Sequence, residues 1–172
     1  LAIPSDTVRK IQMEAQGGTL TLAYADGSWS LAEDPDYHLD ESSCNAMLTA
    51  VSALNAKREL QEAAGEDYGF SAPQATVTIT TDSGEETLVF GAQNAVTGDV
   101  YLQKAGESAV YTVASSKLNC FLKDKAALFG AFSPAGLTSS AIEAVSYTLA
   151  DGETVSLKAM SEPVESAGSG TS

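Results

Sequence analysis

His38 is the single histidine of the chain, so any serine or cysteine nucleophile that is activated by histidine would have to use it. It lies between Tyr37 and Leu39 in an acidic loop, and no G-x-S-x-G motif presents a nucleophilic serine. One histidine and two distant cysteines also lack the spacing of a zinc site. We therefore interpret His38 as a surface histidine and predict no catalytic residue and no metal site.

Carboxylates gather at residues 33–36 and 40–41, and clustered carboxylates are the ligands that calcium prefers. Leu39, however, stands where an EF-hand loop needs glycine, and Asp40 has another role as the N-cap of a helix. The pattern favours a solvated acidic loop over a calcium site. Glycine-rich phosphate-binding motifs are absent as well, so we predict no cofactor and expect that the protein is not an enzyme.

Two cysteines, Cys44 and Cys120, each fall about one turn inside a predicted helix. Cys120 points away from the apolar stripe of its helix, so an oxidising compartment would favour a disulfide between the two. Cys44 belongs to the apolar stripe of its own helix and should face a sheet rather than the other helix. We expect two free thiols, with a Cys44–Cys120 disulfide as the alternative.

Three aromatic residues, Trp29, Tyr101 and Tyr111, lie in predicted strands and form a possible ligand surface. Alternating strands also place aromatic side chains in cores, and this second interpretation is favoured. The surface would serve a domain that binds a small ligand or a carbohydrate.

The first half of the chain reads as strands followed by one helix. Leu20-Thr21-Leu22 alternates strictly, and Asp26-Gly27 predicts a two-residue hairpin turn because both positions favour positive φ. Asp40 then caps a helix that we expect to end near Lys57-Arg58, cations suited to a helix C-terminus. The apolar stripe of this helix consists of Cys44, Met47, Leu48, Val51 and Leu54.

The second half repeats this plan, with alternating strands, glycine turns and a second helix that begins at Ser115 or Ser116 and reaches Phe129. A third hairpin follows after residue 140. The predicted fold is α+β, a tandem repeat of an antiparallel β-meander plus one packed helix. The single domain spans residues 1–160, with repeats at about 7–65 and 74–130, a hairpin at 141–159 and a disordered tail at 161–172.

Acidic residues dominate the charge: 23 Asp and Glu against nine Lys and Arg give a net charge of −14. A nucleic-acid partner needs clustered cations to neutralise phosphates, and an anionic membrane surface would repel this chain. We therefore expect no nucleic acid among its partners. No run of 18 apolar residues predicts a membrane span.

Residues 8–129 resemble an uncharacterised bacterial family, DUF4340, in several strand, turn and helix segments. These segments are Ile11-Gln12-Met13, Leu20-Thr21-Leu22, Asp26-Gly27-Ser28-Trp29, Asp67-Tyr68-Gly69-Phe70, Val77-Thr78-Ile79, Tyr101-Leu102, Val110-Tyr111 and Leu122-Lys123-Asp124-Lys125. Phe70 departs from the family pattern, which has leucine there. The resemblance implies an extracytoplasmic domain that a lipoprotein signal or another membrane anchor outside this sequence holds at the cell surface or on the periplasmic side.

The resemblance also implies a place near ABC-type transport or gliding-motility components, and no known activity. The resulting expectation is a non-enzymatic interaction or scaffold module, accessory to a membrane complex, with a protein partner in the cell envelope. Two alternatives stay open: a small-ligand or carbohydrate-binding domain, and a hydrolase that uses a pair of carboxylates.

Overall fold

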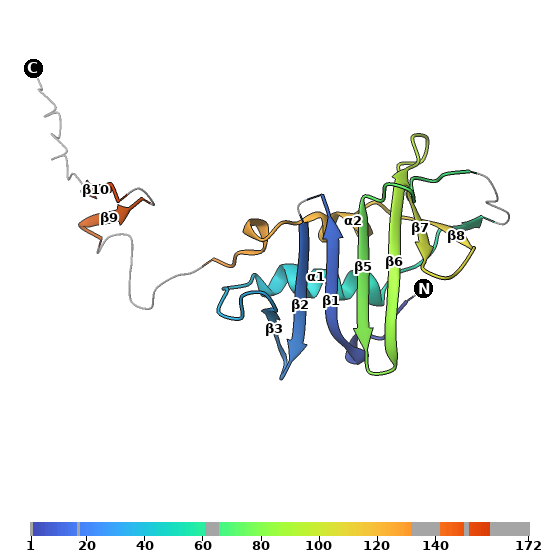
Figure 1. The fold of residues 1–172 in the computed structure, drawn as a ribbon, viewed down its shortest axis with the longest axis horizontal. Coiled ribbons are helices and arrows are strands. Elements are labelled where there is room, and N and C mark those ends of the chain that lie inside the picture. Colours follow the sequence, from blue (N-terminus) through green and yellow to red (C-terminus); the bar gives the residue numbers. More distant parts are fainter. Residues whose placement is uncertain (1, 17, 61–65, 132–141, 150–151, 159–172) are drawn as a thin grey trace, which may run out of the picture. The chain divides into compact units, whose positions relative to one another are not determined.

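A computed structural model describes residues 2–16, 18–60, 66–131, 142–149 and 152–158 (Figure 1). By its contacts the chain divides into two compact units, Leu1–Ala131 and Phe132–Ser172, and each is described by itself. The predicted tail at 161–172 lies outside the described residues.

An eight-stranded antiparallel sheet forms the first unit, in the order β3-β2-β1-β5-β6-β7-β8-β4. The meander β1-β2-β3 and the meander β5-β6-β7-β8 meet where β1 pairs with β5. The strands are β1 (Val8–Ala15), β2 (Gly18–Ala25), β3 (Ser28–Leu31), β4 (Arg58–Leu60), β5 (Ala75–Thr81), β6 (Gly84–Gln93), β7 (Val100–Lys104) and β8 (Val110–Val113).

The turn between β2 and β3 is the predicted two-residue hairpin turn. Asp26 and Gly27 have φ values of 54° and 84°, the left-handed conformation that such turns need. The prediction at this position is confirmed.

Alternation along the strands gives the sheet two unlike faces. One face, which we call the covered face, carries fully buried apolar side chains such as Ile11, Val77 and Leu88. The opposite, open face carries half-buried polar side chains: Gln12 lies beside Thr78, and Thr78 beside Thr87, on neighbouring strands. The hydrophobic core therefore sits on one side of the sheet only.

Helical segments pack over the covered face. Helix α1 (Glu41–Ser52) runs across β1, β2 and β5 (Figure 1). It begins at Asp40, whose side chain accepts a hydrogen bond from the Ser42 backbone N–H, and it buries its predicted stripe against the core. Short 3-10 helices add to this layer: η1 (Ser5–Thr7), η2 (Cys120–Leu122) and η3 (Ala126–Leu128). None of the helices within the described ranges is long and apolar enough to cross a bilayer.

The prediction that the first helix reaches Lys57-Arg58 is wrong. The helix ends at Ser52, and Leu54 is buried just beyond it. The chain then becomes extended, because β8 offers an unpaired edge: the Lys57 N–H donates to the Thr112 carbonyl at 2.8 Å, and β4 pairs with β8. Arg58 thus belongs to the sheet, and Lys57 leads directly into it.

The second predicted helix is also much shorter than expected. Helix α2 covers Ser116–Asn119 only, and η2 follows it directly. Lys123 then has extended backbone (ψ 134°), so the segment between η2 and η3 is not helical. Leu128 is fully buried, while Phe129 is about half exposed. This segment therefore packs against the core through single side chains and not through a continuous helical stripe.

The second unit contains an antiparallel hairpin of β9 (Ala144–Thr148) and β10 (Thr154–Lys158), which confirms a hairpin in the predicted region. Its register places Tyr147 opposite Val155 and Val145 opposite Leu157 on one face. Strands and helical segments together make the chain broadly α+β, as predicted.

Candidate functional site

His38 lies where the acidic loop closes against the end of the first unit. Its carbonyl accepts a hydrogen bond from the Gly130 N–H at 2.8 Å, and its ring lies edge-on to Phe129 with centroids 6.0 Å apart. The neighbouring residue Leu39 forms an isolated β-bridge with Phe129. These contacts give His38 a role in joining two chain segments.

Both cysteines are free thiols in the structure, so the alternative of a disulfide is not formed there. Burial raises the pKa of the Cys44 thiol and that of the Cys120 thiol to about 11 each. Cys44 is fully buried on the inner side of α1, and the Cys120 thiol donates to the Lys117 carbonyl at 3.4 Å. At neutral pH neither side chain is a thiolate, the form that acts as a nucleophile.

The carboxylates of the acidic loop form ion pairs and hydrogen bonds with other segments of the first unit. Asp34 forms an ion pair with Lys125 at 2.8 Å, and Glu33 accepts from the Thr21 N–H at 3.3 Å. Hydrogen bonds from the Ser42 and Ser43 side chains lower the pKa of Asp40 to about 2. In the part of the chain that the structure describes, no three His, Cys, Asp or Glu side chains come together as possible metal ligands.

The structure does not bring the three predicted aromatic residues together. Trp29 is buried on the covered face, with its ring 4.8 Å from Tyr24 and its indole N–H donating to Asn45 at 3.2 Å. Tyr111 packs against the same core. Tyr101 alternates with the buried residues of β7 and therefore lies on the open face.

A loop at residues 67–71 brings a second aromatic ring to Tyr101. The Asp67 carboxylate accepts hydrogen bonds from the Gly69 N–H and the Ser71 hydroxyl, and the Tyr68 carbonyl accepts from the Ala92 N–H at 2.7 Å. The Tyr68 and Tyr101 rings are 4.6 Å apart. A β-carbon on Gly91 would stand 2.3 Å from the Tyr68 carbonyl oxygen, so glycine is required for this close approach.

Beside this aromatic pair lies a small pocket on the open face, with a volume of about 80 Å³. Tyr101, Thr112 and Arg58 form a row across it, because Tyr101 pairs with Thr112 between β7 and β8, and Thr112 with Arg58 between β8 and β4. We call this the β4–β8 pocket. Its lining residues are Arg58, Leu60, Asn94, Thr97, Asp99, Tyr101 and Thr112.

Most polar atoms of the β4–β8 pocket have partners, and one buried atom does not. The Lys57 ammonium donates to the Asp99 carboxylate at 2.5 Å, and the Asn94 amide donates to the Tyr101 hydroxyl at 2.7 Å. The hydroxyl of Thr112, a residue only 6% exposed, has no hydrogen-bond partner within the described part of the chain. A buried polar atom without a partner is rare and costs free energy.

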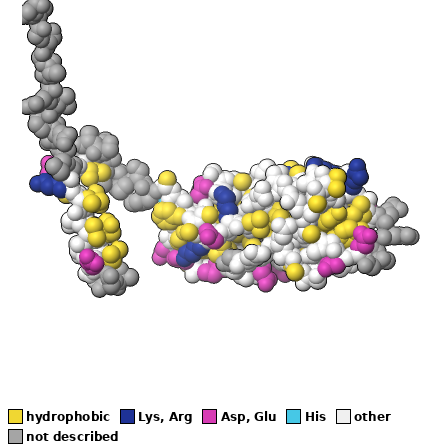
Figure 2. Space-filling model, turned by 90° about the horizontal axis from the view of Figure 1, so that it is seen from above, with side chains coloured by type: hydrophobic (Ala, Val, Ile, Leu, Met, Phe, Trp, Pro, Cys, Tyr) yellow, Lys and Arg dark blue, Asp and Glu magenta, His cyan; other side chains and the backbone are white. Residues whose placement is uncertain are grey.

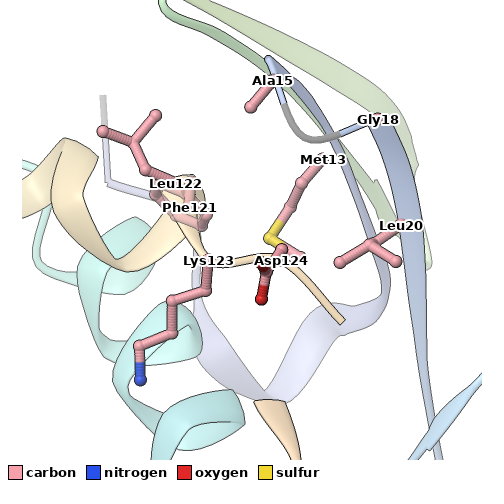
Figure 3. Close-up of a pocket in the computed structure, with 8 residues that line it drawn as sticks. All are labelled: Met13, Ala15, Gly18, Leu20, Phe121, Leu122, Lys123 and Asp124. Carbon is pink, nitrogen blue, oxygen red and sulfur yellow. The ribbon is translucent and has the colours of Figure 1, made fainter. Parts of the chain in front are cut away.

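A second hollow lies between the β1–β2 hairpin and η2 (Figure 3). Its volume is about 10 Å³, room for about one water molecule. The Lys123 ammonium turns away from Met13 and Leu20 and donates to the Ser43 hydroxyl at 2.6 Å. This hollow is a packing gap in the core.

Sequence reasoning found Tyr101 but missed Arg58, Asp99 and Thr112. The local sequence predicts a helix end at Arg58, and no local pattern shows that β4 pairs with the distant strand β8. The signal that was present is Asn94, whose side chain accepts from the Val96 and Thr97 N–H groups in a tight turn. That turn brings Asp99 to the pocket.

Fold and site together define an α+β module with a small polar pocket on an open sheet face. The model of a family described as a domain of unknown function, DUF4340, matches residues 29–170. The chain therefore belongs to the DUF4340 family, as the sequence resemblance predicted. No curated protein and no solved structure matches the chain.

Proposed function

We propose that the chain is a non-enzymatic, extracytoplasmic interaction module, anchored to a membrane and accessory to an ABC-transporter-type complex. The observation that carries the proposal is the apolar face of the β9–β10 hairpin. Family membership supports the location, because the resemblance implies a membrane-anchored domain on the outer side.

The hairpin has one apolar and one polar face. Val145, Tyr147 and Leu157 share the apolar face and are 48%, 48% and 60% exposed. Hydrophobic side chains form a band along the hairpin in Figure 2. A two-stranded hairpin is marginally stable by itself in water, so covering this face by a partner would stabilise it. The partner that fits the proposed location is a subunit of a membrane complex.

The edges of the large sheet are poorer interfaces. Its edge strands are β3, with four residues, and β4, with three. Short edge strands offer few unpaired backbone groups, which limits the addition of a partner's strand. The hairpin face is therefore the surface that we assign to the partner.

The proposal keeps the tandem repeat that the sequence predicts. Each meander is followed by a helix over the covered face, α1 after β3 and α2 after β8, and the first strands of the two meanders pair antiparallel through β1 and β5. The β9–β10 hairpin would correspond to the hairpin that opens each repeat. Strand β4 departs from a simple repeat, because it follows the first helix in the chain but pairs with β8 of the second meander.

Photo-crosslinking in native cell envelopes tests the proposal, with the anchored full-length protein. A photoreactive phenylalanine replaces Tyr147 on the apolar face, and in the matched control it replaces Ser156 on the polar face. We expect position 147 to crosslink to one subunit of a membrane complex and position 156 to crosslink to none. Absence of a crosslink from position 147, or equal crosslinking from both positions, would contradict the proposal.

A second candidate function, binding of a small ligand or carbohydrate, has the β4–β8 pocket in its favour. The hydrolase alternative predicts two facing carboxyl groups in a pocket. The β4–β8 pocket holds one carboxylate, Asp99, and Lys57 pairs with it. We therefore keep ligand binding, and not hydrolysis, as the second candidate.

A further inference from the structure

Hydrogen-bond donors remain unused in the β4–β8 pocket. Thr112 has a buried hydroxyl without a partner. The Tyr101 oxygen accepts from Asn94, and its own O–H has no acceptor among the described residues. Arg58 carries five N–H donors and forms no ion pair within the described residues.

Several acceptors of the pocket, by contrast, already accept hydrogen bonds. The Asp99 carboxylate takes the Lys57 ammonium, and the Asn94 side-chain oxygen takes two backbone N–H groups. The Thr97 hydroxyl oxygen accepts from the Asp99 N–H at 3.3 Å. The remaining donors favour a ligand that brings hydrogen-bond acceptors.

The local charge agrees with an acceptor that is negative. The Lys57 and Asp99 charges compensate each other, and Arg58 leaves one positive charge at the pocket. This local positive charge contrasts with the net charge of −14 and favours an anion at the pocket.

The volume of the β4–β8 pocket limits the size of the anion that it can hold. A water molecule needs about 10–15 Å³ on this measure, so the pocket's 80 Å³ holds only a few non-hydrogen atoms. A carboxylate is planar, accepts two parallel hydrogen bonds from one guanidinium and fits this space. Tyr101 and Leu60 supply apolar surface for the carbon that bears it.

We infer that the β4–β8 pocket binds the carboxylate of a small acid or of a chain terminus, with Arg58 as the charged partner and the buried Thr112 hydroxyl as a second donor. The inference rests on the second candidate function, ligand binding, and stands whether or not the hairpin binds a partner.

Calorimetric and NMR titration of the full chain with sodium acetate tests the inference, with acetamide as the neutral isostere and sodium chloride at matched ionic strength. We expect acetate to shift the amide signals of Asn94, Tyr101 and Thr112, and acetamide to leave them in place. Arg58→Gln should weaken acetate binding at least tenfold, and Thr112→Val about three- to tenfold, the effect of one lost hydrogen bond.

Matched controls separate the pocket from general charge and stability. Arg9→Gln removes an arginine from β1, and Thr78→Val removes a threonine hydroxyl from the same open face; both should bind acetate within twofold of the unchanged protein. Arg58→Lys keeps the charge without the paired N–H geometry and should bind weakly. Equal shifts with acetate and acetamide, or full binding by Arg58→Gln, would overturn the inference.

Two further titrations complete the test. The first identifies whether the carboxylate belongs to a chain terminus or to a small acid, and the second separates ligand binding in general from carboxylate binding. Short peptides with a free or an amidated C-terminus are titrated beside acetate; tighter binding of the free peptide assigns a chain terminus, and tighter binding of acetate assigns a small acid. Equal binding of both peptide forms contradicts carboxylate recognition. Glucose that shifts the same signals while acetate does not would keep ligand binding as the function and overturn the carboxylate inference.

Discussion

The covered and open faces of the eight-stranded sheet are built from alternate residues of the same strands, yet they differ in kind. Along β5, Val77 and Ile79 are fully buried under the helical layer, whereas Thr76, Thr78 and Thr80 are half-buried on the open face. The helical segments of the first unit pack over the covered face. The open face has no helix of the described residues over it, and it carries the β4–β8 pocket.

This difference separates stability from binding within single strands. Apolar burial drives folding, so changes on the covered face should lower the free energy of unfolding most. On the open face most side chains are half-buried or exposed, and Thr112, at 6% exposed, is an exception. Substitutions on the two faces of one strand therefore test the distinction directly.

Phe90→Ala gives the largest expected effect. Phe90 is fully buried on the covered face, with its ring 5.9 Å from that of Phe121. Its truncation should lower the free energy of unfolding by about 3–5 kcal/mol, through lost transfer energy and a cavity. Val89→Ala, one residue away on the open face, is the matched control and should cost about 1 kcal/mol or less. Urea unfolding measures the free energy of unfolding of both variants. Similar decreases in the two variants would contradict the proposed difference between the faces.

Gly91→Ala tests how the aromatic wall of the pocket is held. The added β-carbon meets the Tyr68 carbonyl and the Phe70 ring, so we expect a loss of about 1–3 kcal/mol and loss of the NMR contact between the Tyr68 and Tyr101 rings. Gly106→Ala is the control: its φ of 84° costs about 1 kcal/mol, but no atom stands near the new β-carbon. An intact ring contact in Gly91→Ala would show that the loop relaxes without cost.

Thr112→Val should act in the opposite direction and raise stability by about 1 kcal/mol in acetate-free buffer. The change removes a buried hydroxyl without a partner and keeps the shape of the side chain. Thr78→Val is the control, because the Thr78 and Thr87 hydroxyls are within hydrogen-bond distance at 3.1 Å; its stability should stay within about 0.5 kcal/mol or fall. Thermal unfolding gives both values. A clear loss for Thr112→Val would mean that its hydroxyl is satisfied in solution.

The covered face was largely predictable from the sequence and the open face was not. Strict alternation around Leu22 and the stripe of Cys44, Met47 and Val51 identify buried positions, because periodicity reports which side of an element meets the core. Pairing between distant strands leaves no such local signal. Arg58 and Thr112 become neighbours only through β4–β8 pairing, so the pocket could not be read from either segment alone.

Helix lengths failed for a related reason. The cations of Lys57-Arg58 suit a helix C-terminus locally. The edge of β8, however, offers backbone hydrogen bonds to the same segment, and the chain forms strand β4 there instead of a longer helix. Around Leu118 and Phe121 the apolar spacing is helical, while only single side chains reach the core. Tertiary contacts override local propensity in both segments.

The smallest effect concerns the attachment of the helical layer and depends on pH. The pKa of Asp40 is lowered from 3.8 to about 2, first by hydrogen bonds from the Ser42 and Ser43 side chains. A carboxylate whose pKa is lower in the folded state stabilises that state above about pH 4, and the stabilisation disappears as the pH falls through about 2. Asp40→Ala should therefore lower the melting temperature at pH 7, and the difference from the unchanged protein should shrink towards pH 2.

Two further variants show whether the cap or the charge is responsible. Asp40→Asn keeps an acceptor for the Ser42 N–H but cannot titrate, so its own contribution should not change with pH. Asp36→Ala removes an exposed carboxylate from the same loop and is the matched control at both pH values. If Asp40→Ala and Asp36→Ala gave parallel pH profiles, the cap would contribute nothing specific to the attachment of α1, and the covered face would owe its stability to apolar packing alone.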